Sequence, residues 1–172
     1  MRTAVVYYSL GGNTAFAAAR IAQILQADLF PLETVEDFPK QGLRKFWRGG
    51  QSVMRQETPA LKPCPFDPEA YDLVILGFPV WAGNVATPLR TFVLEHREAL
   101  SHLRLGSVAC QSGSGGHQAF ARLAQSIGIS AIPLRLILND PRSRPAPENE
   151  KKIRMFCQAC LVSDPCFVTF EI

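Results

Sequence analysis

Short apolar runs alternate with amphipathic segments along most of the chain, and this alternation restricts the fold more than any other feature. The runs cover residues 3–8, 27–32, 73–78, 105–111 and 133–138, and the strongest of them reads LVILGF. Runs of this length that are rich in Val, Leu and Ile are typical of strands buried on both faces. Strands alternating with helices predict an α/β fold, with helices on both faces of a parallel sheet.

The segments between these runs have the period of helices that pack one face on a sheet. From Ala18 to Leu25, apolar residues recur at every third or fourth position. Thr87 is expected to be the N-cap of a second helix, with Pro88 in its first turn. Gly128 is expected to end a third helix. The later helices are expected at about residues 87–96, 116–127 and 148–161.

Length and composition indicate one domain over residues 1–172, with an insertion at about 38–68. A chain of 19.0 kDa forms a single core of ordinary size. No apolar stretch reaches the ~20 residues that span a membrane, so no membrane span is expected, and no secretory signal is recognised.

The five scattered cysteines favour reduced thiols in the cytoplasm. A net charge of +3 is too small and too dispersed to indicate nucleic-acid binding.

The insertion is rich in Pro, Gly and basic residues. It is longer than a simple connection, so we expect short helices at the surface. Its side chains can meet an acidic partner, a nicotinamide phosphate or a second subunit in a homodimer, while a solvated helix is the alternative. The residues concerned are Lys40, Arg44, Lys45, Phe46, Trp47, Arg48 and Arg55.

Three glycine-bearing loops follow the first, third and fourth predicted strands. Ligands of parallel α/β sheets bind beyond the carboxyl ends of the strands, where these three loops converge. The first loop reads SLGGNT and leads into a helix, whose N-terminus offers N–H groups and partial positive charge to a phosphate. It lacks the lysine of nucleoside triphosphatase loops and the spacing of dinucleotide loops. A capping loop without a ligand is the alternative.

The other two loops supply an aromatic residue and backbone donors. Trp81 in FPVWAGN is placed to stack on a planar ligand, with Pro79 and Gly83 shaping the turn; a hydrophobic plug is the alternative. The third loop, QSGSGGH, offers backbone donors to the edge of a flat ring, or is simply a surface turn. It lacks the G-x-S-x-G of a nucleophile elbow. A thiolate phosphatase requires an arginine that closes the loop after Cys110, and Gly116 and His117 stand there instead.

Taken together, SLGGNT, PVWAGN and SGSGGH resemble the three FMN-binding loops of the flavodoxin-like family, and the resemblance covers nearly the whole chain. It implies a three-layer αβα sandwich around a five-stranded parallel sheet of order 2-1-3-4-5. It also implies FMN as the cofactor. No catalytic residue and no metal ligand is assigned.

The resemblance also implies a role for each loop. The first holds the ribityl phosphate, the second stacks its aromatic side chain on the flavin, and the third lines the pyrimidine side. The residues are Ser9, Leu10, Gly11, Gly12, Asn13 and Thr14 in the first loop, Pro79, Val80, Trp81, Ala82 and Gly83 in the second, and Ser112, Gly113, Ser114, Gly115, Gly116 and His117 in the third.

The expected function is electron transfer to a redox partner protein or to a small acceptor such as a quinone. The alternative is an NAD(P)H-dependent FMN quinone-type reductase, because the chain has a pI of 8.7 whereas electron-shuttle members are typically acidic. A cofactor-free scaffold of the same fold is a non-redox alternative. A receiver-type signalling module needs clustered acidic residues at the ends of the first and third strands, where the chain has Tyr8, Ser9, Phe78 and Pro79.

Cys157 and Cys160 have the spacing of a redox pair, but they are expected in a helix core. Reactive pairs lie at a helix N-terminus, whereas these two fall well inside the last predicted helix, on the same face as Ile153 and Phe156. We therefore interpret them as core residues.

Overall fold

A computed structural model of the chain describes residues 1–36, 50–53, 55, 57–162 and 168–170. One sheet forms its centre, with parallel strands in the order β2-β1-β3-β5-β6-β7 and a short strand, β4, antiparallel to the end of β3. The strands are β1 (Thr3–Tyr7), β2 (Asp28–Pro31), β3 (Leu73–Trp81), β4 (Asn84–Val85), β5 (Arg104–Gln111), β6 (Leu134–Asn139) and β7 (Val168–Phe170).

The α/β class and the order of the five expected strands are confirmed. β2, β1, β3, β5 and β6 lie side by side, which is the order 2-1-3-4-5 when only these five are counted. Val5 in β1 pairs with Leu29 in β2 on one side and with Ile75 in β3 on the other. The sheet differs from the expectation in having β4 beside the end of β3 and β7 beyond β6.

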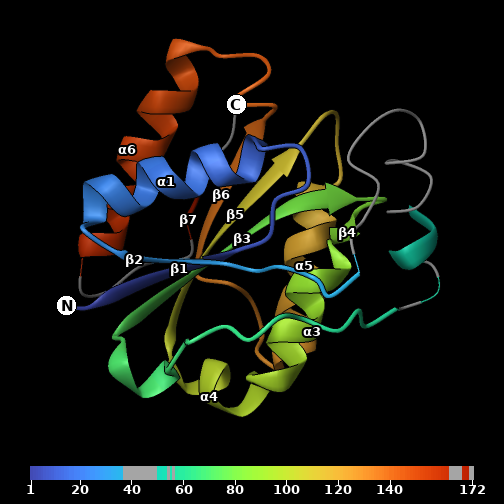
Figure 1. Cartoon of the computed structure of the whole chain (residues 1–172). Coiled ribbons are helices and arrows are strands. Elements are labelled where there is room, and N and C mark those ends of the chain that lie inside the picture. Colours follow the sequence, from blue (N-terminus) through green and yellow to red (C-terminus); the bar gives the residue numbers. More distant parts are fainter. Residues whose placement is uncertain (37–49, 54, 56, 163–167, 171–172) are drawn as a thin grey trace.

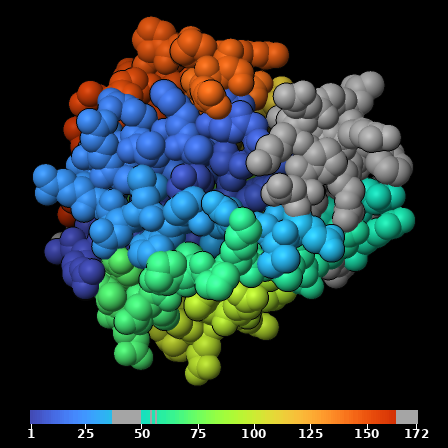
Figure 2. Space-filling model, viewed as in Figure 1, coloured from blue at the N-terminus to red at the C-terminus, as the bar shows by residue number. Residues whose placement is uncertain are grey.

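Helices cover both faces of the sheet (Figure 1). α1 (Asn13–Leu25) and α6 (Pro147–Leu161) lie on one face, and α3 (Thr87–Glu95), α4 (Arg97–His102) and α5 (Gly116–Ile127) lie on the other. A single 3-10 turn, η1 (Pro68–Ala70), precedes β3. In the space-filling view, the blue residues of the N-terminal part lie below the orange residues of the C-terminal part, and green to yellow-green residues form the opposite side (Figure 2).

The centre of β3 is buried against both helical layers. Val74, Leu76 and Phe78 belong to the core cluster beneath α3 and α5, and Leu73 and Ile75 to the cluster beneath α1 and α6. Alternate side chains of a strand point to opposite faces, so one continuous apolar run supplies two cores. This arrangement explains why the sequence shows no polar alternation in this strand.

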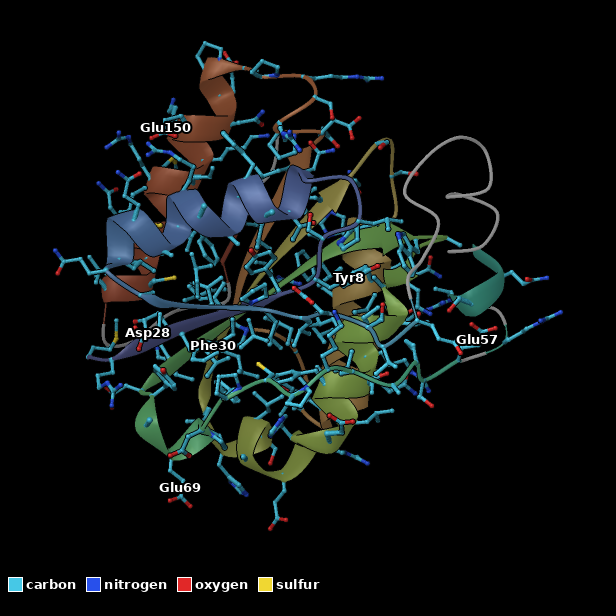
Figure 3. All side chains as sticks on the ribbon, viewed as in Figure 1. Tyr8, Asp28, Phe30, Glu57, Glu69 and Glu150 are labelled. Atoms are coloured by element: carbon cyan, nitrogen blue, oxygen red, sulfur yellow. The ribbon has the colours of Figure 1, made fainter. Side chains whose placement is uncertain are left out.

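An ion pair joins the two helices of the α1–α6 layer. Nη2 of Arg20 lies 2.6 Å and Nε lies 3.2 Å from the two carboxylate oxygens of Glu150 on α6 (Figure 3). These hydrogen bonds from Arg20 hold the pKa of Glu150 below its usual value. Both side chains are about one-third exposed, so the pair fixes the helix orientation more than it stabilises the fold.

Two expectations about helix ends have different outcomes. Gly128 is the C-cap of α5 with a φ of 93°, as expected. The expectation that Thr87 caps α3 is wrong, because Ala86 occupies the N-cap position and Thr87 is the first helical residue. The Thr87 hydroxyl is buried and lies 2.8 Å from the hydroxyl of Ser52, so a distant segment satisfies it.

The described cysteines of α6 are core residues, as expected. Cys157 and Cys160 are fully buried in the cluster that contains Phe156, and burial raises the pKa of each thiol to about 12. A thiol with so high a pKa stays protonated near neutral pH and is a poor nucleophile.

Nearly half of the expected insertion lies outside the described residues, including Lys40, Arg44, Lys45, Phe46, Trp47 and Arg48. Within it, residues 50–53 are helical and Arg55 is exposed. Throughout the described part of the chain, no helix combines the length and apolar character needed to cross a membrane.

We predict that Phe156→Ala lowers the free energy of unfolding by about 3 to 5 kcal/mol, because a fully buried aromatic ring is replaced by a cavity. The neighbouring variant Met155→Ala is the control, since Met155 is 43% exposed and its loss costs about 0.5 kcal/mol. Urea denaturation measures both. Equal losses in the two variants would contradict the packing of α6 described here.

Candidate functional site

A cleft of about 290 Å³ opens at the carboxyl ends of β1, β3 and β5. It lies between β1 and β3, whose following connections lead to opposite sides of the sheet, β1 to β2 and β3 to β5, and ligands of open α/β sheets bind at such a point. It brings together five residues of the first predicted loop, four of the second and one of the third. Its lining residues are Ser9, Leu10, Gly11, Asn13, Thr14, Gly50, Pro79, Val80, Trp81, Ala82, Cys110, Ser112 and Asp140.

The first loop turns tightly into α1. Ser9 Oγ accepts hydrogen bonds from the N–H groups of Gly12, at 3.2 Å, and Ala15, at 3.1 Å. Gly12 is the N-cap residue with a φ of 86°, a left-handed conformation that glycine adopts without strain. The glycine and the serine together place the positive end of the α1 dipole at the cleft.

Thr14 presents a buried hydroxyl that lacks a hydrogen-bond partner. The residue is 1% exposed and lines the cleft, and its Oγ1 makes no hydrogen bond within the described part of the protein. On the sheet side, the Thr14 methyl group faces Gly77 of β3. A Cβ atom at position 77 would lie 3.3 Å from Thr14 Cγ2, so glycine leaves room for this methyl group. A buried hydroxyl without a partner is unfavourable, and a polar ligand in the cleft would satisfy it.

Asp140 joins the first and third loops, and the sequence analysis did not identify it. Its Oδ1 accepts hydrogen bonds from Asn13 Nδ2 at 3.1 Å and from Ser112 Oγ at 2.7 Å. Its side chain is 10% exposed, and Nε of Arg144 lies 3.7 Å from Oδ2. The signal in the sequence was its position directly after β6, at the same edge as the three loops.

Asn13 is held on both sides of its amide. While its Nδ2 donates to Asp140, its Oδ1 accepts hydrogen bonds from the N–H groups of Arg142, at 2.9 Å, and Ser143, at 3.1 Å. Its side chain therefore connects the first loop to the turn after β6. In this arrangement Asn13 positions the loop.

Arg142 was also missed, and it lies against the first loop. A Cβ atom at Gly12 would overlap the guanidinium group of Arg142, which shows how closely this exposed, flexible side chain approaches the loop. A cation beside a helix N-terminus is unfavourable by itself, because both carry positive charge. An anion bound at the first loop would attract both the guanidinium group and the helix N-terminus and would so offset this repulsion.

The second loop is a β-hairpin rather than an irregular connection. β3 continues three residues beyond the expected end at Phe78, and Trp81 pairs with Asn84 of β4 across a two-residue turn. Ala82 and Gly83 both have positive φ, 49° and 68°, as two-residue hairpin turns require. The hairpin places Trp81 on the cleft wall.

The ring of Trp81 packs edge-on against the ring of Tyr8, at the end of β1 (Figure 3). The ring centroids are 5.8 Å apart and the planes are nearly perpendicular, at 86°. Tyr8 is buried and Trp81 is half-buried, so the indole is fixed on one side and borders the cleft.

The third loop is divided between two hollows. Ser112 lines the cleft, whereas Ser114, Gly115, Gly116 and His117 line an adjacent hollow of about 220 Å³. Gly113 and Gly83 are absent from the lining of both. Gly115 has a φ of 106°, and a Cβ there would lie 2.8 Å from Gly83 Cα. The third loop therefore packs directly on the hairpin.

Cys110 lies in the cleft lining at the end of β5. Burial raises the pKa of its thiol to about 12, and the nearby Thr14 hydroxyl, which does not have hydrogen-bond geometry to the sulfur, offsets this rise only in part. The thiol is therefore neutral near pH 7 and adds no charge to the cleft.

Residues 2–139 match the family model described as Flavodoxin. The chain belongs to the flavodoxin family. This confirms the family expected from the three loops, and membership supports FMN as the cofactor. None of the curated proteins matches this flavodoxin-family chain.

Solved structures of flavoproteins share the fold. A flavoprotein from Lactobacillus acidophilus NCFM, in complex with FMN, is 22% identical, with a TM-score of 0.68; the match covers 81% of this chain and 93% of that chain. A flavoprotein from Bacteroides eggerthii is 21% identical, with a TM-score of 0.74; the match covers 94% of this chain and 99% of that chain.

We predict that Asp140→Ala lowers the free energy of unfolding by about 1 to 3 kcal/mol, because Asn13 Nδ2 and Ser112 Oγ lose their shared acceptor. It also places alanine at a φ of 44°. Asp140→Asn should restore most of the loss, since asparagine keeps an acceptor oxygen and tolerates this conformation. Urea denaturation of both variants is the measurement. A stable Asp140→Ala protein would contradict the structural role of this carboxylate.

Proposed function

We propose that this protein binds one FMN in the cleft and transfers electrons between the flavin and a redox partner protein or a small acceptor such as a quinone. The proposal rests on one observation, which is that three features suited to FMN meet in one cleft. These are the N-terminus of α1, the unpartnered hydroxyl of Thr14, and the fixed indole of Trp81.

The first loop suits a phosphate monoester. A dianionic group at the N-terminus of α1 would interact favourably with the helix dipole and accept a hydrogen bond from the Thr14 hydroxyl. Arg142 beside Gly12 would add a positive charge close to the same place. Asp140 opposes anion binding, but its carboxylate is already engaged by Asn13, Ser112 and Arg144.

The cleft wall suits a flat, largely apolar ring. Val80, Trp81 and Ala82 line one side, and the aromatic edge of Tyr8 holds the indole in place. The volume of about 290 Å³ is at the lower end for a ligand pocket, so part of a bound flavin would project into solvent. An exposed ring edge is what electron transfer to an external partner requires.

FMN, when bound, supplies the one- and two-electron chemistry. The residues of this chain bind its phosphate, orient its ring and exclude water from part of it. Cys110 keeps its proton near neutral pH, so it adds no negative charge that would oppose flavin reduction. We also propose the cytoplasm as the compartment, because the described cysteines are free thiols.

A reductase that takes electrons from NAD(P)H and passes them to a quinone-type acceptor is the second candidate. The pI of 8.7 favours it, since a basic protein attracts anionic nucleotides. A homodimer that completes the flavin site from a second subunit is compatible with either function.

We predict that Thr14→Val weakens FMN binding about tenfold without loss of stability. Valine keeps the methyl contact with Gly77 and removes a hydroxyl that has no partner in the described protein. Equilibrium titration with FMN and with riboflavin, together with urea denaturation, provides the measurement.

Riboflavin is the internal control in this experiment because it lacks the phosphate. Its affinity should change little in Thr14→Val. If FMN and riboflavin lose affinity equally, the phosphate does not bind at Thr14.

We further predict that FMN-loaded protein oxidises NADPH in the presence of a quinone no faster than free FMN does, as expected of an electron carrier. The measurement is steady-state NADPH consumption at matched flavin concentration, with NADH in parallel. Turnover well above that of free FMN would contradict the role of electron carrier and would support the role of reductase.

A further inference from the structure

A second hollow, larger than the cleft, lies between α3 and α5 on the face opposite α1. Its volume is about 680 Å³, and it extends to Ala82 and Asn84 of the hairpin. Ala82 lines both hollows, so the two are neighbours across the hairpin. We call this second hollow the arginine groove, because Arg90, Arg97 and Arg122 line it.

The arginine groove is strongly positive. Its arginines come from three consecutive helices: Arg90 from α3, Arg97 from α4 and Arg122 from α5. Arg90 and Arg122 are half-buried. Among the lining residues that the structure describes, none is acidic. Like charges gathered in a concave site raise the local potential and attract anions.

Arg97 is fixed in place by the end of α5. Its Nε donates a 3.2 Å hydrogen bond to the carbonyl of Ile127, in the last turn of that helix. Gly128, the C-cap residue, lies directly beneath the guanidinium group, since a Cβ there would be 2.9 Å from Nη2. Glu95 and Glu98 lie with Arg97 around a neighbouring hollow, so Arg97 borders a region of mixed charge.

The remaining groups of the arginine groove are neutral hydrogen-bonding side chains and a few apolar ones. Asn84 and Gln125 offer amides, and Leu94, which is 40% exposed, offers an apolar surface. Guanidinium groups recognise phosphates, amides recognise sugars and bases, and an apolar side chain packs on a ring. The combination matches a nucleotide better than a simple inorganic anion.

We propose that the arginine groove binds a nucleotide-sized phosphorylated ligand, with a phosphate at Arg122. The volume of about 680 Å³ lies well within the range of small-molecule sites. A concave site of this volume suits a small ligand, whereas a stable protein interface buries an extended surface on each partner. This site is separate from the proposed flavin site and does not depend on FMN binding.

ADP is the probe, measured by calorimetry on the apoprotein and on protein saturated with FMN. We expect ADP to bind both forms, more weakly as ionic strength rises, and adenosine not to bind measurably. Arg122→Gln should weaken ADP binding about tenfold, the loss of one charge-assisted interaction. Arg154→Gln on α6 is the matched control, since this exposed arginine lies on the other face, and it should leave ADP binding unchanged.

Several results would overturn the proposal. Failure of ADP to bind, equal binding of adenosine, or an unchanged affinity in Arg122→Gln would each do so. Displacement of ADP by FMN would show that ADP occupies the cleft instead. Binding of polyglutamate in place of ADP would assign the arginine groove to an acidic protein partner.

The FMN affinity of Arg122→Gln separates this proposal from the proposed function. Because Arg122 does not line the cleft, this affinity should equal that of the unsubstituted protein. If the protein binds ADP but not FMN, the proposal for the arginine groove stands and the proposed flavin function is wrong. If it binds FMN but not ADP, only the proposed flavin function stands.

Discussion

Burial of β3 on both faces is the constraint on which the rest of the structure depends. Val74, Leu76 and Phe78 pack into one helical layer while Leu73 and Ile75 pack into the other, so β3 lies at the centre of the sheet. β1 and β5 pair with it in parallel, so the carboxyl ends of the three strands meet at one edge. The cleft forms at that edge.

Contacts between distant segments then hold the loops in position. Asp140 joins Asn13 to Ser112, and the close approach of Gly115 to Gly83 packs the third loop on the hairpin. A side chain at Gly115 would meet the backbone of Gly83 and push the two loops apart. The cleft is thus preorganised by the protein, which lowers the entropic cost of ordering a ligand site.

The sequence was sufficient for the features that depend on local pattern. The apolar runs predicted all five main strands, and the glycine loops predicted three of the segments that meet at the cleft, the third through Ser112 alone. It was insufficient where a contact links remote residues. Asn13 and Asp140 are 127 positions apart, and the Thr87 hydroxyl bonds to Ser52 instead of capping its helix. Neither pairing leaves a periodic signal.

The most direct test of the flavin site is a fluorescence titration of the apoprotein with FMN, for the unsubstituted protein and for Trp81→Leu. The chain has two tryptophans, so the variant reports on Trp47 alone. We predict saturation at one FMN per chain, with quenching that is largely lost in Trp81→Leu, because the flavin lies against that indole. Absence of saturable binding, or undiminished quenching in the variant, would contradict a flavin site at this cleft.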